Sequence, residues 1–398
     1  MKTCRSIICT ILQSTVSSQS LLLSGKIENT DQNTITIYRF DSSFIHKINL
    51  DREGNFSDSF QVDRPGFFTF IVGKTYFNLF LQNGFNLKMS FDAIDYINSA
   101  RYEGIGSKIN NYATSLNKLK SELIGDNKVY FIESAEDFIK KNNGYKKTLY
   151  DDLEKSGLNN EEYGFMRKMI DYNCLLIRNN YRKFYVFNTK KEPYIPDNYY
   201  DPIRAVDMND VIAYNNSMDY RYLIIDKWRI AVSDAQKIDS NLSAIQITEE
   251  FIQPIKYEPI RDQIVRMLFN KVDPRNSDYE MDYLQIVKLV RLEKSKINLN
   301  NRLASARATE MGKTTATFTY ENFNGGTTSL ASLRGKYVYI DIWATWCGPC
   351  LREFPELKKL IEDFQGNNIE FVCISIDKLE EIEKWKKLVK EKNLGGIQ

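Results

Sequence analysis

Residues 335–355 read GKYVYIDIWATWCGPCLREFP, and this stretch decides the fold of the last part of the chain. It contains a continuous apolar run, Tyr337 to Trp343, of the kind found in strands that are buried on both faces. Two cysteines follow this run, and apolar residues then recur at helical spacing as far as Phe364. A second apolar run comes next, from Ile369 to Ile376. The pattern predicts two parallel strands joined by a helix in a right-handed crossover.

The pair Cys347 and Cys350 can open and close a disulfide as a chemical cycle. At the start of the predicted helix, Cys347 would lie beside unpaired backbone N–H groups and the positive end of the helix dipole, which both favour its thiolate. We therefore expect Cys347 to attack a partner disulfide and Cys350 to resolve the mixed disulfide. Gly348 and Pro349 form the turn, because proline is tolerated in a first helical turn. A static disulfide or an incidental pair of cysteines is the alternative.

Two carboxyl groups belong to the same candidate site. Asp341 lies in an otherwise apolar strand, where burial should raise its pKa and suit it to accept the proton of Cys350. The alternative is an ordinary acid at a solvated strand end. Glu353 follows Cys350 by three residues and so shares its helical face, although it could equally be an exposed acid favoured by the helix dipole. We assign substrate binding to Trp346, Gly348 and Pro349.

Residues 335–355 resemble the active-site segment of TlpA/ResA-type thioredoxin-like proteins of bacterial envelopes. The resemblance continues through Ser375-Ile376-Asp377 and Trp385, and back through Gly325 and Ser329-Leu330 to Phe318, so that it covers residues 312–398. It implies a thioredoxin-like α/β domain that reduces or exchanges protein disulfides through the redox-active disulfide Cys347–Cys350, with no other cofactor. In that family the residue that matches Asp341 handles the proton of the resolving thiol. The residue that matches Glu353 influences the acidity of the cysteines.

The same resemblance implies partners and a location. The partners are protein disulfide substrates and a membrane-bound thiol reductant, and the location is the periplasm or cell envelope. Residues 1–19 fit this location, because Lys2 and Arg5 precede a short apolar stretch and a small-residue cleavage pattern, which together predict an export signal. No other segment has the ~20 apolar residues that span a bilayer, so we expect no transmembrane segment in the mature chain.

The resemblance also predicts that the domain is truncated at its C-terminus. Thioredoxin-like folds have a further pair of strands, a last helix and a cis-proline that faces the cysteines, whereas the last proline here is Pro355. A cis bond at another residue costs roughly 2.5–4 kcal/mol. Ala316 stands where the family usually has proline. We therefore expect an incomplete domain with impaired activity.

The rest of the chain divides into two regions. Residues 20–104 contain short apolar runs separated by turn residues, which predict a seven-stranded β-sandwich. The runs are Leu21 to Ile27, Thr34 to Phe40, Phe44 to Leu50, Phe56 to Val62, Phe67 to Val72, Tyr76 to Leu81 and Phe85 to Phe91.

Residues 105–308 change to helical periodicity and predict an all-α region. Its clearest helices are Ser134 to Leu153, a helix capped by Asn159 or Asn160, Asp210 to Ile230, Glu258 to Val272 and Ser277 to Leu292. The fold class is thus multidomain α+β, with the incomplete α/β domain at residues 312–398.

Composition excludes several classes of function. The chain has 54 basic and 52 acidic side chains, and its formal charge of +2 is not the strongly basic balance that is typical of nucleic-acid-binding proteins. Cys4 and Cys9 would leave with the export signal, and Cys174 and Cys373 lie on apolar stripes where a buried thiol is expected. The only histidine is His46, so a zinc site with four Cys or His ligands is not expected, and we predict no metal.

Two other functions compete with thiol-disulfide exchange. A thiol peroxidase would need Thr three residues before the reactive cysteine, and Ala344 is at that position. A non-enzymatic envelope binding protein would use the first 300 residues, with the truncated thioredoxin-like domain as a vestige.

Overall fold

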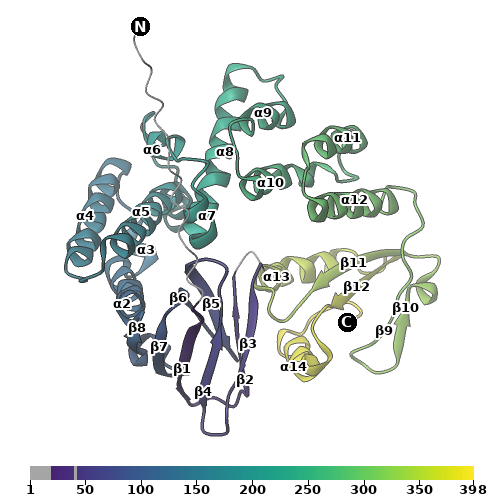
Figure 1. The fold of residues 1–398 in the computed structure, drawn as a ribbon. Coiled ribbons are helices and arrows are strands. Elements are labelled where there is room, and N and C mark those ends of the chain that lie inside the picture. The colour runs from purple at the N-terminus through teal and green to yellow at the C-terminus, as the bar shows by residue number, and fades with distance from the viewer. Residues whose placement is uncertain (1–18, 40–42) are drawn as a thin grey trace. The chain divides into compact units, whose positions relative to one another are not determined.

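The computed structural model describes residues 19–39 and 43–398 (Figure 1). The predicted export signal, apart from Gln19, lies outside the described residues. The chain forms two compact units, one ending at Leu303 and the other running from Ala304 to Gln398. Both contain helices and strands, so the fold is a mixed α/β one. None of the helices in the described ranges is both long and apolar enough to cross a membrane.

The first unit begins with two four-stranded sheets, in which seven strands match the seven predicted apolar runs. One sheet has the order β4-β1-β7-β8 and the other has the order β3-β2-β5-β6. The strand bounds are β1 Leu21–Glu28, β2 Thr34–Tyr38, β3 Ile45–Asn49, β4 Asn55–Phe60, β5 Gly66–Val72, β6 Thr75–Leu81, β7 Asn86–Asp92 and β8 Arg101–Ile105. Strand β8 was not predicted, because the short stretch Arg101–Ile105 has four exposed residues and lacks an apolar alternation.

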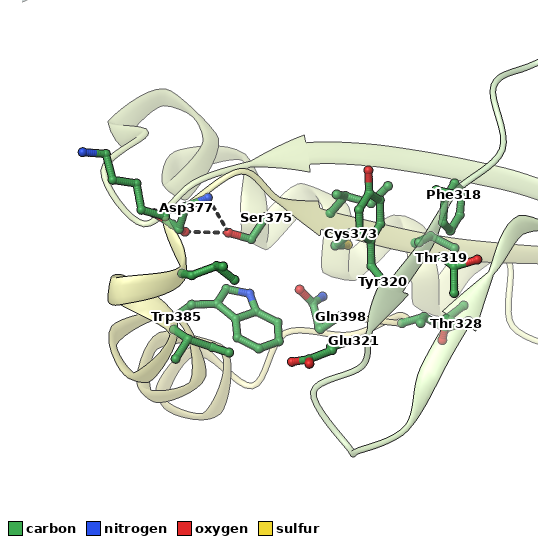
Figure 2. Close-up of a pocket in the computed structure, with 16 residues that line it drawn as sticks. Phe318, Thr319, Tyr320, Glu321, Thr328, Cys373, Ser375, Asp377, Trp385 and Gln398 are labelled. Atoms are coloured by element: carbon green, nitrogen blue, oxygen red, sulfur yellow. Dashed lines mark hydrogen bonds between the residues drawn. The ribbon is translucent and has the colours of Figure 1, made fainter.

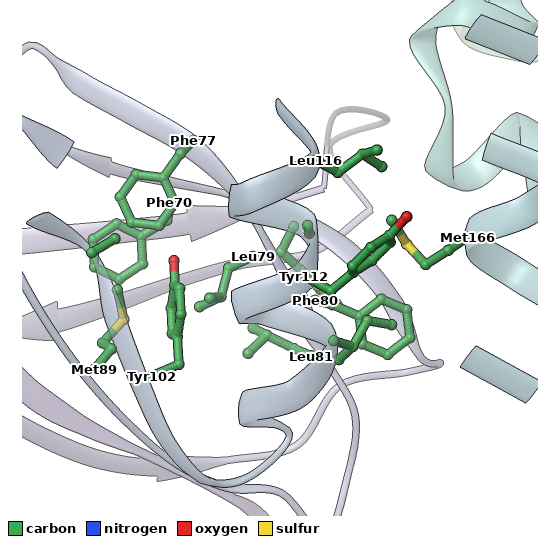
Figure 3. Packing of buried hydrophobic residues seen from close by; sticks show 14 of the residues in the cluster. Phe70, Phe77, Leu79, Phe80, Leu81, Met89, Tyr102, Tyr112, Leu116 and Met166 are labelled. Atoms are coloured by element: carbon green, nitrogen blue, oxygen red, sulfur yellow. The ribbon is translucent and has the colours of Figure 1, made fainter. Parts of the chain in front are cut away.

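Alternating side chains of these strands form the core of the unit. Along β5 every second residue is buried, from Gly66 through Phe68 and Phe70 to Val72. The same alternation holds in β7, where Leu87, Met89 and Phe91 point inward. Burying one such side chain contributes roughly 1.5–3 kcal/mol to folding. Figure 3 shows Leu79 and Phe80 of the sheet packed beside Tyr112 and Leu116 of the helix that follows the sheets.

Helices make up the rest of the first unit. Their bounds are α1 Tyr96–Ser99, α2 Ser107–Ile124, α3 Asn127–Tyr130, α4 Ala135–Glu154, α5 Asn160–Thr189, α6 Asp201–Arg204, α7 Val211–Asn216, α8 Met218–Ile238, α9 Ala244–Phe251, α10 Glu258–Arg266, α11 Tyr279–Leu289 and α12 Glu293–Ala308, the last of which runs on into the second unit. The caps of two predicted helices, α4 and α5, follow the local sequence. Ser134 caps α4, and Asn159 caps α5 in a capping box with Glu162.

The structure corrects the helix that was predicted from Asp210 to Ile230. The chain instead breaks at Ser217, which has an extended backbone and ends α7. The Ser217 hydroxyl accepts a hydrogen bond from the N–H of Tyr220, so the same residue caps the start of α8. A serine side chain that competes for the backbone in this way favours a helix end over a helix interior.

Asparagine side chains join the sheets to the helices that follow them. Asn110 of α2 is 2% exposed, and its amide pairs with both backbone groups of Phe80 in β6, at 2.8 and 2.9 Å. A third bond runs from Asn110 to the carbonyl of Gly106 at 2.9 Å. Asn216 likewise accepts a bond from the N–H of Phe67 at 2.8 Å. These side chains take the place of a neighbouring strand and satisfy backbone groups that burial would otherwise leave unpaired.

The second unit is built around the predicted strand–helix–strand motif. Its elements are β9 Thr319–Glu321, β10 Thr327–Ser329, the 3₁₀ turn Leu330–Leu333, β11 Tyr337–Trp343, α13 Gly348–Asp363, β12 Ile369–Ser375, a 3₁₀ turn at Leu379–Glu381 and α14 Ile382–Lys392. Strands β11 and β12 are parallel, with Asp341 opposite Cys373. On the other edge of β12, the N–H of Cys373 donates to the carbonyl of Ile397 at 2.8 Å.

The structure also corrects the expectation that β11 is buried on both faces. Its Trp343 is 1% exposed, but Tyr337 and Ile342 are 76% and 61% exposed. The reason is that β11 has only β12 as a paired neighbour among the described strands, so its apolar run is covered mainly near Trp343. The continuous apolar sequence therefore predicted the strand correctly, but its prediction that both faces are buried was wrong.

Replacing Asn110 tests the link between α2 and the sheets. Asn110→Ala should lower the free energy of unfolding by about 2–4 kcal/mol, because it leaves both buried backbone groups of Phe80 without a partner. Urea denaturation of the full chain measures this change. Asn117→Ala is the matched control, since Asn117 is exposed on the same helix and should change stability by less than about 0.5 kcal/mol. Equal effects of the two substitutions would contradict the assigned role.

Candidate active site

The two cysteines lie where β11 ends and α13 begins. Cys347 occupies the N-cap position of α13, and a disulfide joins it to Cys350 with the Cα atoms 5.3 Å apart. The backbone N–H of Cys350 points at the Cys347 sulfur, with 3.3 Å between nitrogen and sulfur. Both cysteines are half-buried. The sulfur of Cys347 therefore occupies the position that a capping oxygen takes in other helices, next to N–H groups that would stabilise a negative charge.

A tight turn connects the strand to this helix. The N–H of Cys347 donates to the carbonyl of Ala344 at 3.0 Å, and the N–H of Leu351 donates to the carbonyl of Cys347 at 3.0 Å. Gly348 and Pro349 are the first helical residues, and both are exposed. Proline causes no loss of a hydrogen bond there, because the first N–H groups of a helix have no partner within it.

The two tryptophans beside the cysteines have different surroundings. Trp343 is buried and packs edge-on against Phe354 of α13, with the ring centres 5.0 Å apart. Trp346 is 63% exposed. All three residues assigned to substrate binding are exposed next to the disulfide: Trp346, Gly348 and Pro349. Trp343 instead packs inside the unit, in one apolar cluster with Cys373 and Trp385.

Asp341 lies on the same face of β11 as Trp343, because side chains alternate along a strand. This face carries α13, as the contact between Trp343 and Phe354 shows. Burial raises the pKa of Asp341, and the nearby negative charge of Glu353 raises it further. Glu353 itself is exposed on α13. The fold thus brings the two predicted carboxyl groups close enough to interact, and it gives Asp341 the pKa direction expected of a proton acceptor.

Residue Asp377, which follows β12, makes contacts that sequence reasoning missed. Its carboxylate accepts the N–H of Thr345 at 2.9 and 3.1 Å and the Thr345 hydroxyl at 2.8 Å. It also accepts the hydroxyl of Ser375 at 2.6 Å (Figure 2). Burial opposes ionisation of Asp377, but the donors from Ser375 and Thr345 outweigh it and lower its pKa. The sequence signals were that Thr345 and Asp377 each stand two positions after a parallel strand and that Ser375-Ile376-Asp377 belongs to the family resemblance.

A cavity of about 350 Å³ lies beside Asp377 and β12 (Figure 2). Its lining comes from β9 and the residue before it, β10, β12 and the turn after it, α14 and the last two residues of the chain: Phe318, Thr319, Tyr320, Glu321, Thr328, Val372, Cys373, Ile374, Ser375, Asp377, Lys378, Leu379, Ile382, Trp385, Ile397 and Gln398. Its lining includes neither Cys347 nor Cys350. The cavity and the disulfide are therefore distinct features of the unit.

The other described thiols are unsuited to reaction. Cys174 is 3% exposed, and burial raises its pKa to about 12. Cys373 is also 3% exposed, and burial followed by the charge of Asp341 raises its pKa to about 11. A thiol must ionise to attack a disulfide, so these groups stay inert near neutral pH. Within residues 19–39 and 43–398, no group of three or more His, Cys, Asp or Glu side chains is arranged to hold a metal ion.

Comparison with known proteins identifies relatives of the second unit. The family model described as AhpC/TSA family matches residues 311–393. The thiol-disulfide oxidoreductase ResA of Bacillus subtilis strain 168 is 31% identical over 77 residues, which are 19% of this chain and 43% of ResA. Among solved structures, the thioredoxin domain of a thiol-disulfide oxidoreductase from Bacteroides vulgatus is 31% identical and covers 22% of this chain and 61% of its own, with a TM-score of 0.21. A thioredoxin-like protein from Bacteroides caccae is 19% identical and covers 51% of this chain and 80% of its own, with a TM-score of 0.29.

The family model and the ResA match concern the last part of the chain, whereas the Bacteroides caccae structure covers 51% of it. The chain spans less than half the length of the ResA protein that it matches. Residues 311–393 are a thioredoxin-like domain at the C-terminal end of the chain, related to thiol-disulfide oxidoreductases.

Proposed function

We propose that this protein is a thiol-disulfide oxidoreductase that reduces or exchanges disulfides of protein substrates in the cell envelope. One observation carries the proposal: the Cys347–Cys350 disulfide lies at the N-terminus of α13, where the Cys347 sulfur accepts a backbone N–H. This placement favours a thiolate at Cys347 and keeps the second sulfur three residues away. The relationship to named thiol-disulfide oxidoreductases supports the same conclusion.

The proposed reaction transfers two electrons to the substrate. The Cys347 thiolate attacks one sulfur of a substrate disulfide, forms a mixed disulfide and releases the other substrate sulfur as a thiolate. Cys350 then loses its proton and attacks the Cys347 sulfur. This step releases the second substrate thiol and closes the Cys347–Cys350 disulfide. A membrane-bound thiol reductant would return the pair to the dithiol, and the disulfide itself is the only redox group that the cycle requires.

Asp341 and Glu353 would control the proton of the resolving step. The pKa of Asp341 is raised by burial and then by Glu353, so its carboxylate is a stronger base than an exposed aspartate. It can accept the proton of Cys350 when the mixed disulfide is resolved. Glu353 influences this step through its charge, from an exposed position one helical turn beyond Cys350.

Substrates would bind over the exposed turn. Trp346 offers an aromatic surface that is 63% exposed, and Ile376 beyond β12 is 57% exposed. Thr345 bonds to Asp377, so the segments that carry these two residues lie side by side. An unfolded or extended segment with a disulfide can contact Trp346, Gly348 and Pro349 while its sulfur approaches Cys347.

Single cysteine variants test the roles of the two thiols. Cys347→Ser should reduce the rate of insulin-disulfide reduction to that of the added dithiothreitol alone, because the attacking thiolate is missing. Cys350→Ser should instead accumulate a mixed disulfide with a substrate, visible on a non-reducing gel, because the second attack cannot occur. Cys174→Ser is the matched control and should retain the parent rate, since its thiol is buried.

Three outcomes would contradict this proposal. Trapping by Cys347→Ser in place of Cys350→Ser would reverse the roles of the thiols. Consumption of peroxide without a dithiol substrate would favour a thiol peroxidase, and absence of any turnover by the parent chain would favour a binding protein.

Asp341→Asn tests the raised pKa. Because the folded-state pKa of Asp341 lies above its unfolded value, its protonation stabilises the fold at low pH, and this contribution is lost as pH rises through the folded pKa. Asparagine cannot lose a proton. The free energy of unfolding of the variant relative to the parent should therefore increase from about pH 4 towards neutral pH. Urea denaturation across this range measures the difference.

The exposed Asp363, at the end of α13, provides the control for this measurement. The same series on Asp363→Asn separates the effect of Asp341 from that of removing an exposed carboxyl group. In the same series, Asp341→Asn should slow the release of substrate from the mixed disulfide by up to about 100-fold if the carboxylate is the proton acceptor. An unchanged release rate would remove Asp341 from the proposed chemistry, whatever its effect on stability.

A further inference from the structure

The two parallel strands of the second unit are joined where they leave the sheet. After β11, Thr345 is 7% exposed and donates both its N–H and its hydroxyl to the Asp377 carboxylate. After β12, the N–H of Ile376 donates to the carbonyl of Trp343 at 2.9 Å. The hydroxyl of Ser375 bonds to the same carboxylate at 2.6 Å and accepts the N–H of Asp377 at 3.1 Å. The hydrogen bonds that this carboxylate accepts within the described part of the chain thus come from the two strand exits, and the charge of Lys384 also acts on it.

This set of bonds lies two residues from the proposed nucleophile. The turn that follows Thr345 is closed by the bond from the N–H of Cys347 to the carbonyl of Ala344 at 3.0 Å. With Ala344 and Thr345 held, the backbone of Cys347 has little freedom. Its sulfur is then kept within 3.3 Å of the backbone nitrogen of Cys350. Backbone N–H groups at a helix start stabilise a thiolate only while the sulfur stays next to them.

We propose that Asp377 and Thr345 are positioning residues that hold the Cys347 sulfur against the start of α13. This inference rests on the proposed function, because it concerns the reactivity of the same cysteine. Asp377 touches no reacting atom and acts through Thr345. A carboxylate suits this position because both of its oxygens accept, whereas asparagine would turn an N–H₂ group towards one of the donors.

The charge of Asp377 and its positioning role have opposite effects on Cys347. A negative charge disfavours a nearby thiolate, so the loss of the charge alone would lower the pKa of Cys347. A loosened turn would raise this pKa, because the sulfur would move away from the N–H groups. Substitution of Thr345 separates the two effects, since it changes no charge.

The test compares Thr345→Val, Thr345→Ser and Asp377→Asn with the parent, in the full-length reduced chain. The pH dependence of alkylation, followed at Cys347 by mass spectrometry, gives the pKa of this thiol. Thr345→Val keeps the shape of the side chain but loses its hydroxyl. It should raise the Cys347 pKa by about one unit and so leave roughly tenfold less thiolate at neutral pH. Thr345→Ser restores the hydroxyl and should restore the parent value.

Two further variants provide a control and a substitute for Thr345→Val. Glu380→Gln removes one negative charge from an exposed position close to Asp377 in sequence, and it should leave the Cys347 pKa unchanged. If circular dichroism shows that Thr345→Val does not fold, Ser375→Ala replaces it. That variant removes one donor from Asp377 while Thr345 stays intact, and a smaller rise of the Cys347 pKa is expected.

The outcomes distinguish this inference from the proposed function. A lower melting temperature for Thr345→Val with an unchanged Cys347 pKa would overturn the positioning role and leave a structural one. A lower Cys347 pKa in Asp377→Asn, with no change in Thr345→Val, would overturn it in favour of charge alone. Failure of the parent disulfide to equilibrate with glutathione would contradict the proposed function, while the comparison of pKa values would still decide the role of Asp377 and Thr345.

Discussion

The parallel pairing of β11 with β12 is the constraint on which the candidate site depends. Parallel strands joined by one helix leave the sheet at the same edge. The register, with Trp343 opposite Ser375, therefore brings the segment before Cys347 next to the segment that contains Asp377. The same crossover starts α13 at this edge, so the cysteines, the helix dipole and the carboxylate of Asp377 all meet there. A shift of the register would separate them.

Burial and hydrogen bonding act in opposite directions on the two aspartates of this sheet. Asp341 is partly buried and has Glu353 nearby, so its pKa rises. Asp377 also loses contact with water, yet donors from Ser375 and Thr345 lower its pKa. The raised pKa of Asp341 suits the proposed uptake of a proton. The lowered pKa of Asp377 favours its ionised form, which accepts hydrogen bonds from Thr345 and Ser375. Burial is the main influence on the thiols of Cys174 and Cys373, raises the pKa of both and leaves them inert near neutral pH.

Local patterns in the sequence predicted individual elements well. Seven of the eight strands of the first two sheets and the capped starts of α4 and α5 follow from alternation and from capping residues that act within a few positions. The two errors have different causes, since one arose from a local side chain that competes for the backbone and the other from how little of the chain covers a strand. Ser217 breaks a helix in a stretch with continuous helical periodicity, and the apolar run of β11 is exposed at Ile342 because few elements cover it.

The sequence by itself determined the chemistry of the candidate site: two cysteines three positions apart, at the junction of an apolar strand and an amphipathic helix, with an acid inside the strand. Only the tertiary structure decided which polar groups hold that junction. Thr345 and Asp377 are 32 positions apart, and Asn110 and Phe80 are 30 positions apart. Such pairs form because sheet order and register place distant segments side by side. No local preference of either residue encodes the contact, since a threonine, an aspartate or an asparagine is equally stable when it faces water.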